Sequence, residues 1–186
     1  MTKTRSASIA VILCITMLFS GCNAAWIQDA LNDLPVLVQM ALSIAQIIAV
    51  TKTGTPASAQ EIAAINQISS VATQGLTAIE ALYKSYTSAN STTTIADIQA
   101  AGAALVANLN ALLQAAQIKD PALLARVTSA VGLIVSTVNT ILSLLPKSSS
   151  PADLKAAKRL GSPAGLPKPA DLRAMWQSQV GFALAK

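Results

Sequence analysis

Histidine is absent from this chain of 186 residues, and aromatic residues make up only 3% of it. Without histidine the chain lacks the commonest general base and the commonest metal ligand of proteins. Few aromatic side chains remain for stacking on nucleic-acid bases. The sequence also has no glycine-rich phosphate loop, zinc-ligand spacing or nucleophile–base set. We therefore expect a protein that is not an enzyme, holds no metal or cofactor and binds no nucleic acid.

Charged residues are also scarce, at 11% of the chain, and they are unevenly distributed. Residues 23–146 contain four basic and six acidic residues, whereas residues 147–186 contain seven basic and two acidic ones. The overall charge of +5 therefore comes from the C-terminal tail. The body that precedes the tail is nearly neutral and strongly apolar.

The first 22 residues have the parts of a secretion signal. Lys3 and Arg5 supply positive charge, and an apolar run of 11 residues extends from Ile9 to Phe19. That run is too short to cross a hydrocarbon core of about 30 Å as a helix. Two small residues then precede Cys22. The other cysteine, Cys14, lies inside the apolar run, so we expect no disulfide in the mature protein.

This segment resembles the signal of bacterial lipoproteins, in which a large aliphatic residue and two small residues precede a cysteine. It departs from that pattern at Phe19, where such signals usually have leucine. The resemblance covers only the signal and implies cleavage before Cys22, a diacylglycerol on the cysteine sulfur and an acyl chain such as palmitate on the new amino group. Two or more buried chains give stable anchoring. The alternative is ordinary secretion, with cleavage after Ala24 or Ala25.

The resemblance also implies a location. Asn23 follows the cysteine instead of aspartate, so nothing favours retention in the inner membrane. The expected site is the periplasmic face of the outer membrane. Trp26, four residues beyond the cysteine, would then lie at the membrane–water interface.

Residues 22–146 predict four helices and almost no strand. The first covers 24–50 with a break at Asn32–Pro35, the second follows a capping box at Ser58–Glu61, the third starts after Thr94 and the fourth covers 121–145. The connections are short, which favours antiparallel neighbours. The expected fold class is all-α, an antiparallel four-helix bundle with a basic C-terminal tail that contains short helices.

Several patterns predict how these helices pack. Alanines recur every four residues in the third helix and would let another helix approach closely. In the fourth helix Gly132, Ser136 and Thr140 have the same spacing, which we assign to a buried helix. Asp29 and Asp33 share a face, and we interpret them as a solvated helix start and not as a catalytic pair. The apolar face of the second helix comprises Ile62, Ile65, Ile68, Ala72, Leu76, Ile79 and Tyr83.

The tail, residues 147–186, contains two near-repeats that each begin with proline and place aspartate in the first turn, at 151–156 and 169–174. They predict one or two short helices. Two interpretations stay open. The tail helix docks on the bundle or remains solvated, or else the tail contacts anionic lipid headgroups or an acidic protein partner. The contacting residues would be Lys155, Lys158, Arg159, Lys168 and Arg173, with Trp176 inserting into the membrane.

Three regions follow: a lipoprotein signal peptide at 1–21, a helical bundle at 22–146 and a basic tail at 147–186. The leading hypothesis is a lipid-anchored, non-enzymatic protein of the cell envelope with a structural or protein-interaction role. The alternative is a membrane-inserting helical protein that forms pores or remodels membranes. It rests on the uncharged segments 34–50 and 127–145, which are near the lower length limit for spanning a bilayer. No motif identifies a partner or an oligomeric state.

Overall fold

The computed structural model describes residues 25–51, 56–88, 92–145 and 166–184. Within these ranges the chain is all-helical and contains no strand, which confirms the all-α part of the prediction. The signal peptide, Cys22 and the first proline-containing repeat lie outside the described residues. The six described helices are α2 (Ala25–Ile44), α3 (Ile47–Val50), α4 (Ala59–Tyr86), α5 (Ile95–Ala115), α6 (Pro121–Ser143) and α8 (Pro169–Val180).

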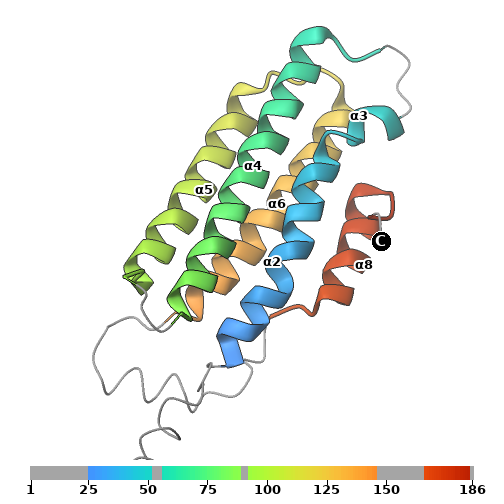
Figure 1. Cartoon of the computed structure of the whole chain (residues 1–186). Helices are drawn as coiled ribbons and strands as arrows, with labels where there is room; N and C mark the ends of the chain where they lie inside the picture. Colours follow the sequence, from blue (N-terminus) through green and yellow to red (C-terminus); the bar gives the residue numbers. More distant parts are fainter. Residues whose placement is uncertain (1–24, 52–55, 89–91, 146–165, 185–186) are drawn as a thin grey trace, which may run out of the picture.

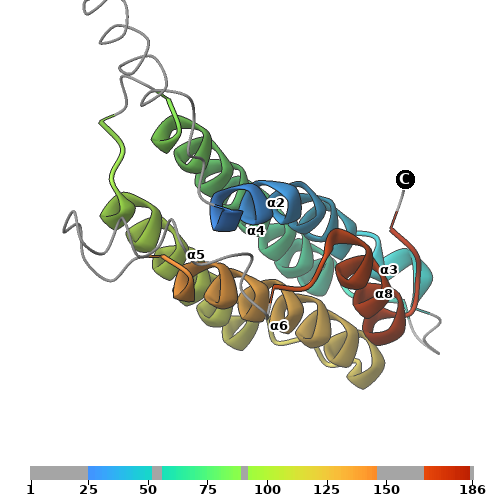
Figure 2. The ribbon, with the colours of Figure 1, turned by 90° about the horizontal axis from the view of Figure 1, so that it is seen from below.

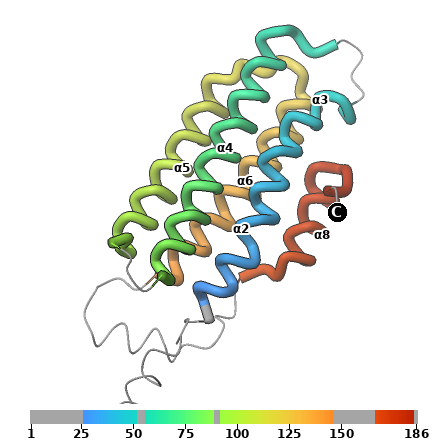
Figure 3. Tube along the Cα trace, viewed as in Figure 1, coloured from blue at the N-terminus to red at the C-terminus, as the bar shows by residue number. Residues whose placement is uncertain are grey.

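The four long helices lie side by side in two layers. Figure 1 shows α2, α4, α5 and α6 with their long axes nearly aligned. Seen from below, α5 and α6 form one layer, and α2 and α4 form the other (Figure 2). Each long helix packs against two of the others, and α8 packs against both α2 and α6. The trace in Figure 3 shows that the connection between α5 and α6 lies at one end of this assembly.

One apolar core joins all the long helices and α8. The predicted face of α4 is confirmed, with the exception of Ile62, whose side chain is 37% exposed. The predicted break at Pro35 is wrong, because α2 continues through this residue and ends only at Ile44. Pro35 is exposed. Proline has no backbone N–H, so one helical hydrogen bond is missing at Pro35. Because Pro35 lies on the solvent side of the helix, water can bind the carbonyl that lacks a partner.

The predicted helix starts are confirmed by their hydrogen bonds. At α4, the Ser58 backbone N–H donates to Glu61 Oε2 at 2.8 Å, and the Glu61 N–H donates to Ser58 Oγ at 3.3 Å. Thr94 and Asp97 make the same reciprocal pair at α5. At α6, Asp120 Oδ1 accepts the Leu123 N–H at 2.8 Å. Each cap satisfies N–H groups that have no partner within the helix.

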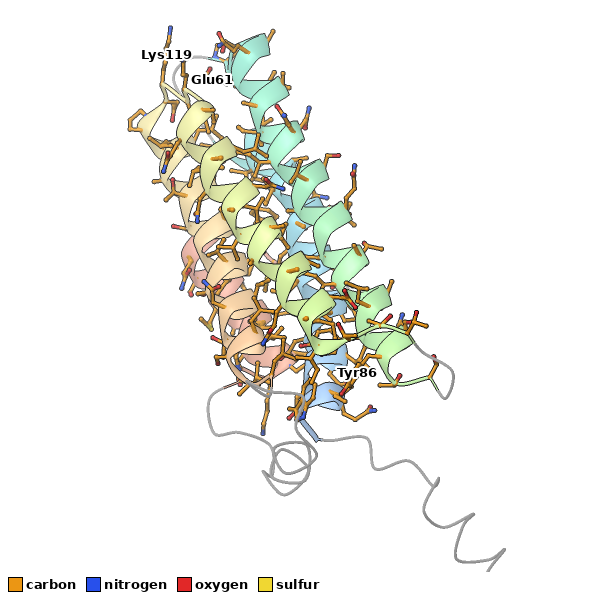
Figure 4. All side chains as sticks on the ribbon, turned by 90° about the vertical axis from the view of Figure 1, so that its left-hand side faces the viewer. Glu61, Tyr86 and Lys119 are labelled. Carbon is orange, nitrogen blue, oxygen red and sulfur yellow. The ribbon has the colours of Figure 1, made fainter. Side chains whose placement is uncertain are left out.

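Glu61 has a second role that its capping motif did not predict. Its other oxygen, Oε1, accepts the backbone N–H of Lys119 at 2.8 Å and that of Asp120 at 3.4 Å. Figure 4 shows Glu61 and Lys119 together at one end of the assembly, with Tyr86 at the other. The backbone hydrogen bond of Ser58, followed by the bonds from its hydroxyl and from Lys119, lowers the pKa of Glu61 to about 2. One carboxylate thus joins the start of α4 to the α5–α6 connection.

Two glycines, and not the predicted alanines, bring α5 close to its neighbours. A Cβ at Gly102 would lie 2.7 Å from the Leu142 side chain of α6, and one at Gly75 of α4 would lie 2.5 Å from Leu105 of α5. The prediction of an alanine ridge at a helix contact is wrong, because its members are exposed: Ala103, Ala107, Ala111 and Ala115. The helix–helix contacts that were predicted for the alanines are made instead by leucine side chains packed against glycines.

The small residues of α6 are likewise not buried. Gly132 and Ser136 are exposed, and Thr140 is half-buried. Apart from the backbone around Gly132 itself, no described atom lies within 4 Å of the position that a Cβ on this residue would take. The assignment of this pattern to a buried helix is therefore wrong for its first two members.

We expect Glu61→Gln to lower the melting temperature at pH 7 by several degrees, because a neutral amide accepts these N–H groups less strongly. The folded-state pKa of about 2 lies below the ordinary value of 4.5. The ionised carboxylate therefore stabilises the fold above pH 4.5, and this contribution is lost as the pH falls toward 2. Thermal unfolding followed by circular dichroism at pH 7 and pH 3 should show the wild-type–variant gap shrinking at the lower pH.

Asp97→Asn is the matched control, because Asp97 also has a lowered pKa through Thr94 but caps only its own helix. Its loss at pH 7 should be smaller than that of Glu61→Gln. Equal losses would contradict the role of Glu61 in joining the two connections.

Candidate functional site

The residues predicted to act on a membrane or a partner are only partly described. Lys168 precedes α8, and Arg173 lies on it; both are exposed. Trp176 lies on the same helix but is fully buried, with 0% exposure. The remaining four lie outside the described residues: Cys22, Lys155, Lys158 and Arg159.

The buried face of α8 explains the position of Trp176. Leu172, Trp176 and Val180 recur every four residues, are buried, and so face α2 and α6. The Trp176 ring meets Phe182 edge to face, with centroids 5.7 Å apart and an interplanar angle of 84°. In this structure the indole is not accessible to a bilayer, and the helix is docked, as in the first of the two interpretations of the tail.

Both ends of α8 are fixed by local chemistry. Asp171 accepts the backbone N–H of Lys168 at 3.2 Å, and Pro169 occupies the first turn. The helix ends at Gly181, whose φ of 91° is left-handed and favours glycine. A Cβ at Gly181 would lie 3.4 Å from the Arg126 guanidinium of α6. Arg126 thus places a positive charge beside the negative end of the α8 dipole.

Comparison with protein families, with curated proteins and with solved structures gave no match. Among the described residues, no group of three or more acidic, cysteine or histidine side chains is placed to hold a metal ion. The candidate sites among the described residues are the docked helix α8 and the two ends of the assembly.

The end of the assembly at which α2 begins is built on aromatic side chains. Trp26 is 4% exposed, and its ring lies 6.1 Å from that of Tyr83 and 6.5 Å from that of Tyr86. The placement of Trp26 at the membrane–water interface is therefore wrong for this structure, because the indole packs on the last turn of α4.

The environment of Asp33 differs from the prediction, because its side chain is buried. It is 1% exposed, and none of the described residues donates a hydrogen bond to its Oδ1. Burial, and then the charge of Asp29, raises the pKa of Asp33 to about 6. The interpretation of this pair as a solvated helix start is therefore wrong for Asp33. Apolar neighbours at Leu34, Val36 and Leu37 were the available sequence signal.

We expect Asp33→Asn to stabilise the protein at pH 7.5 by up to about 3 kcal/mol, because the variant has no buried carboxylate to ionise. The folded-state pKa of about 6 lies above the ordinary value of 3.8. Ionisation therefore opposes folding increasingly between pH 3.8 and 6, and the penalty stays constant above that range. Urea unfolding at pH 7.5 and pH 4 should show the gain disappearing at the lower pH. Asp29→Asn removes the second cause of the raised pKa and should give a smaller gain with the same pH dependence; a gain at Asp33 that is independent of pH contradicts the assignment.

We expect Trp176→Ala to release α8 from the core. Truncation of a buried tryptophan costs about 3–5 kcal/mol, and local undocking of a terminal helix limits the global loss. Hydrogen exchange should show faster exchange in α8 and unchanged exchange in α4. Met175→Ala, at a neighbouring side chain that is 36% exposed, should leave both helices protected. Unchanged protection of α8 in the Trp176 variant contradicts its role in docking.

Proposed function

We propose that this protein is a lipid-anchored, non-enzymatic component of the bacterial cell envelope. Its helices form an antiparallel four-helix bundle that serves as a structural or protein-interaction element. Attachment through a lipid on Cys22, and the periplasmic face of the outer membrane as its location, come from the resemblance of residues 1–22 to a lipoprotein signal. The bundle as the functional unit is supported by the arrangement of the helices.

The observation that carries the proposal is the packing of Trp26 on Tyr83 and Tyr86. Because it fixes the start of α2 to the end of α4, a tether at Cys22 would be joined to a rigid body by only two residues. The lipid would then hold the bundle by one defined end. The end that contains Glu61 and Lys119 would face away from the bilayer (Figure 4).

The direction of the helices supports an antiparallel bundle. In Figure 1, α2 and α5 run upward, and α4 and α6 run downward. In α4, α5 and α6 the charged residues lie toward the ends of the helices. No charged residue lies between Glu61 and Glu80, between Asp97 and Lys119, or between Val127 and Leu145. The central segments of these three helices can therefore pack without burying a charge.

The exposed residues of the docked tail provide a second surface for partners. Lys168 and Arg173 remain in solvent, whereas Trp176 does not. Contact with anionic headgroups or an acidic protein would therefore be electrostatic, and it would weaken with salt.

The proposal predicts that Cys22→Ala converts a membrane-bound protein into a soluble one. Removing the lipid removes about 0.8 kcal/mol for each buried methylene, and no other anchor is proposed. Fractionation of the native envelope, followed by alkaline carbonate extraction, measures the distribution. Ser20→Ala, which keeps a small residue before the cysteine, is the control and should stay membrane-bound. Retention of the Cys22 variant after carbonate would refute anchoring by lipid alone.

A membrane-inserting function is the second candidate, and one observation favours it. Among the described helices, α5 and α6 are long and apolar enough to cross a bilayer by length and composition, a property that they share with core helices of soluble proteins. The earlier choice of segment 34–50 is less favourable, because this segment is divided between α2, which ends at Ile44, and the short α3. Retention of the Cys22 variant, together with leakage from liposomes, would favour insertion over the tethered bundle.

A further inference from the structure

The surface on which α8 docks is shared by α2 and α6. α8 packs against both of these helices, and Figure 2 shows it beside them, outside the two layers of long helices. Isolated helices of about 12 residues are only marginally stable in water. The 12 residues of α8 therefore depend on this contact to stay helical.

One row of apolar side chains makes the contact. Leu172, Trp176 and Val180 are buried, whereas every other residue between Ala170 and Gln179 is exposed. Among the described residues, the hydrogen bonds of α8 remain within the tail. Docking thus relies on apolar burial, which is non-directional, and on the fit of three side chains. Another helix with a row of the same spacing can make the same contact.

The position of Arg126 shows which side of α6 faces α8. Its guanidinium lies 3.4 Å from the position that a Cβ on Gly181, just after α8, would take. Residues four, seven and eleven positions further along α6 share this side: Ala130, Leu133 and Thr137, all buried. The Thr137 hydroxyl donates to the Leu133 carbonyl at 2.8 Å, so it offers no free hydrogen to a docked helix. We name the surface of α2 and α6 that contacts α8 the α8 site; on α6 it is apolar, with one cation at its end.

The α8 site also has a direction. Arg126 lies at the carboxyl end of α8, where the helix dipole is negative. A carboxylate at that end would interact with the guanidinium still more strongly. The site therefore suits an amphipathic helix with three apolar residues at a spacing of four, a large aromatic residue in the middle and its carboxyl end beside Arg126. Recognition of an amphipathic helix in this way is a common mode of protein binding.

α8 itself does not satisfy its site fully. The Trp176 Nε1–H is buried, and none of the described residues accepts it. A buried donor without an acceptor opposes docking. A helix with an aromatic side chain of similar size but no N–H would avoid this cost. What favours α8 over such a helix is its covalent connection to α6, which gives it a high effective concentration at the site.

We propose that the α8 site is a binding site for an amphipathic helix of a partner protein, and that α8 occupies it until such a helix displaces it. Displacement would expose Trp176 and release the C-terminal tail from the assembly. The proposal names a site for the protein-interaction role proposed for the bundle. It does not use the lipid at Cys22, so either proposal can fail without the other.

A fluorescent peptide of residues 166–184 serves as the probe for the site. Two acceptors are compared, each with Cys22→Ala and purified without detergent; one retains Trp176 and the other carries Trp176→Ala. The peptide should bind the Trp176→Ala acceptor at least about tenfold more tightly, because the competing α8 is released there. A peptide that itself carries Trp176→Ala should bind at least about tenfold more weakly. Fluorescence anisotropy measures the dissociation constants.

Val180→Ala is a milder truncation of the same row and provides a second acceptor if the Trp176 variant does not fold. This acceptor should also bind the peptide more tightly than the chain with an intact row does. Absence of binding to both truncated acceptors, or equal binding of the two peptides, would overturn the proposal.

Displacement itself is measured in the chain that retains Trp176, isotopically labelled so that its own α8 can be told from the peptide. At saturating peptide, hydrogen exchange should accelerate at least about tenfold in α8 and stay unchanged in α4. Continued protection of α8 would show that it is not displaced and would contradict the proposal. Protection that is lost with phosphatidylglycerol vesicles but not with the peptide would assign α8 to a bilayer and rule out the protein partner.

Two substitutions test the chemistry of the site. Replacing Trp176 of the peptide by 1-naphthylalanine keeps the size of the ring and removes the N–H, so it should tighten binding at least about fivefold. Arg126→Gln in the acceptor should weaken binding about threefold, whereas Lys119→Gln, at an exposed lysine, should leave it unchanged. Weaker binding of the naphthyl peptide, or equal effects of the two glutamine variants, would overturn the chemistry assigned to the site.

Discussion

Apolar packing holds the long helices together, but it is non-directional and does not by itself set their relative heights. The central segments of α4, α5 and α6 contain no charge that could do so. A few polar contacts fix the heights instead. Glu61 joins the start of α4 to the α5–α6 connection, and the Ser69 hydroxyl donates to the Ala41 carbonyl at 2.7 Å in the buried α2–α4 contact. The core therefore provides cohesion, and these contacts provide register.

Local sequence signals predicted most of the helical framework. The caps at Ser58, Thr94 and Asp120 depend on residues three positions apart, so they can be identified without knowing the tertiary structure. The second role of Glu61 depends on backbone groups 58 and 59 residues away. No spacing rule links a carboxylate to N–H groups that only the fold brings near it.

The regular spacing of residues along a helix was less informative about which face of that helix packs against another helix. It correctly grouped the alanines of α5 and the small residues of α6, but both sets lie largely in solvent, since glycine and leucine make the close contacts. The same limit applies to Asp33 and Trp26. Their burial depends on what surrounds α2, and the sequence of α2 shows only that apolar residues lie beside them.

The hydrogen bonds of Glu61 to the α5–α6 connection affect which substitutions this end of the molecule can accept during evolution. At this connection Glu61 accepts only the main-chain N–H groups of Lys119 and Asp120, and every residue except proline supplies such a group. The side chain at 119 can therefore be replaced freely without loosening the join. A rigid helical end combined with an unconstrained surface position lets new recognition chemistry arise there while the packing beneath it stays the same.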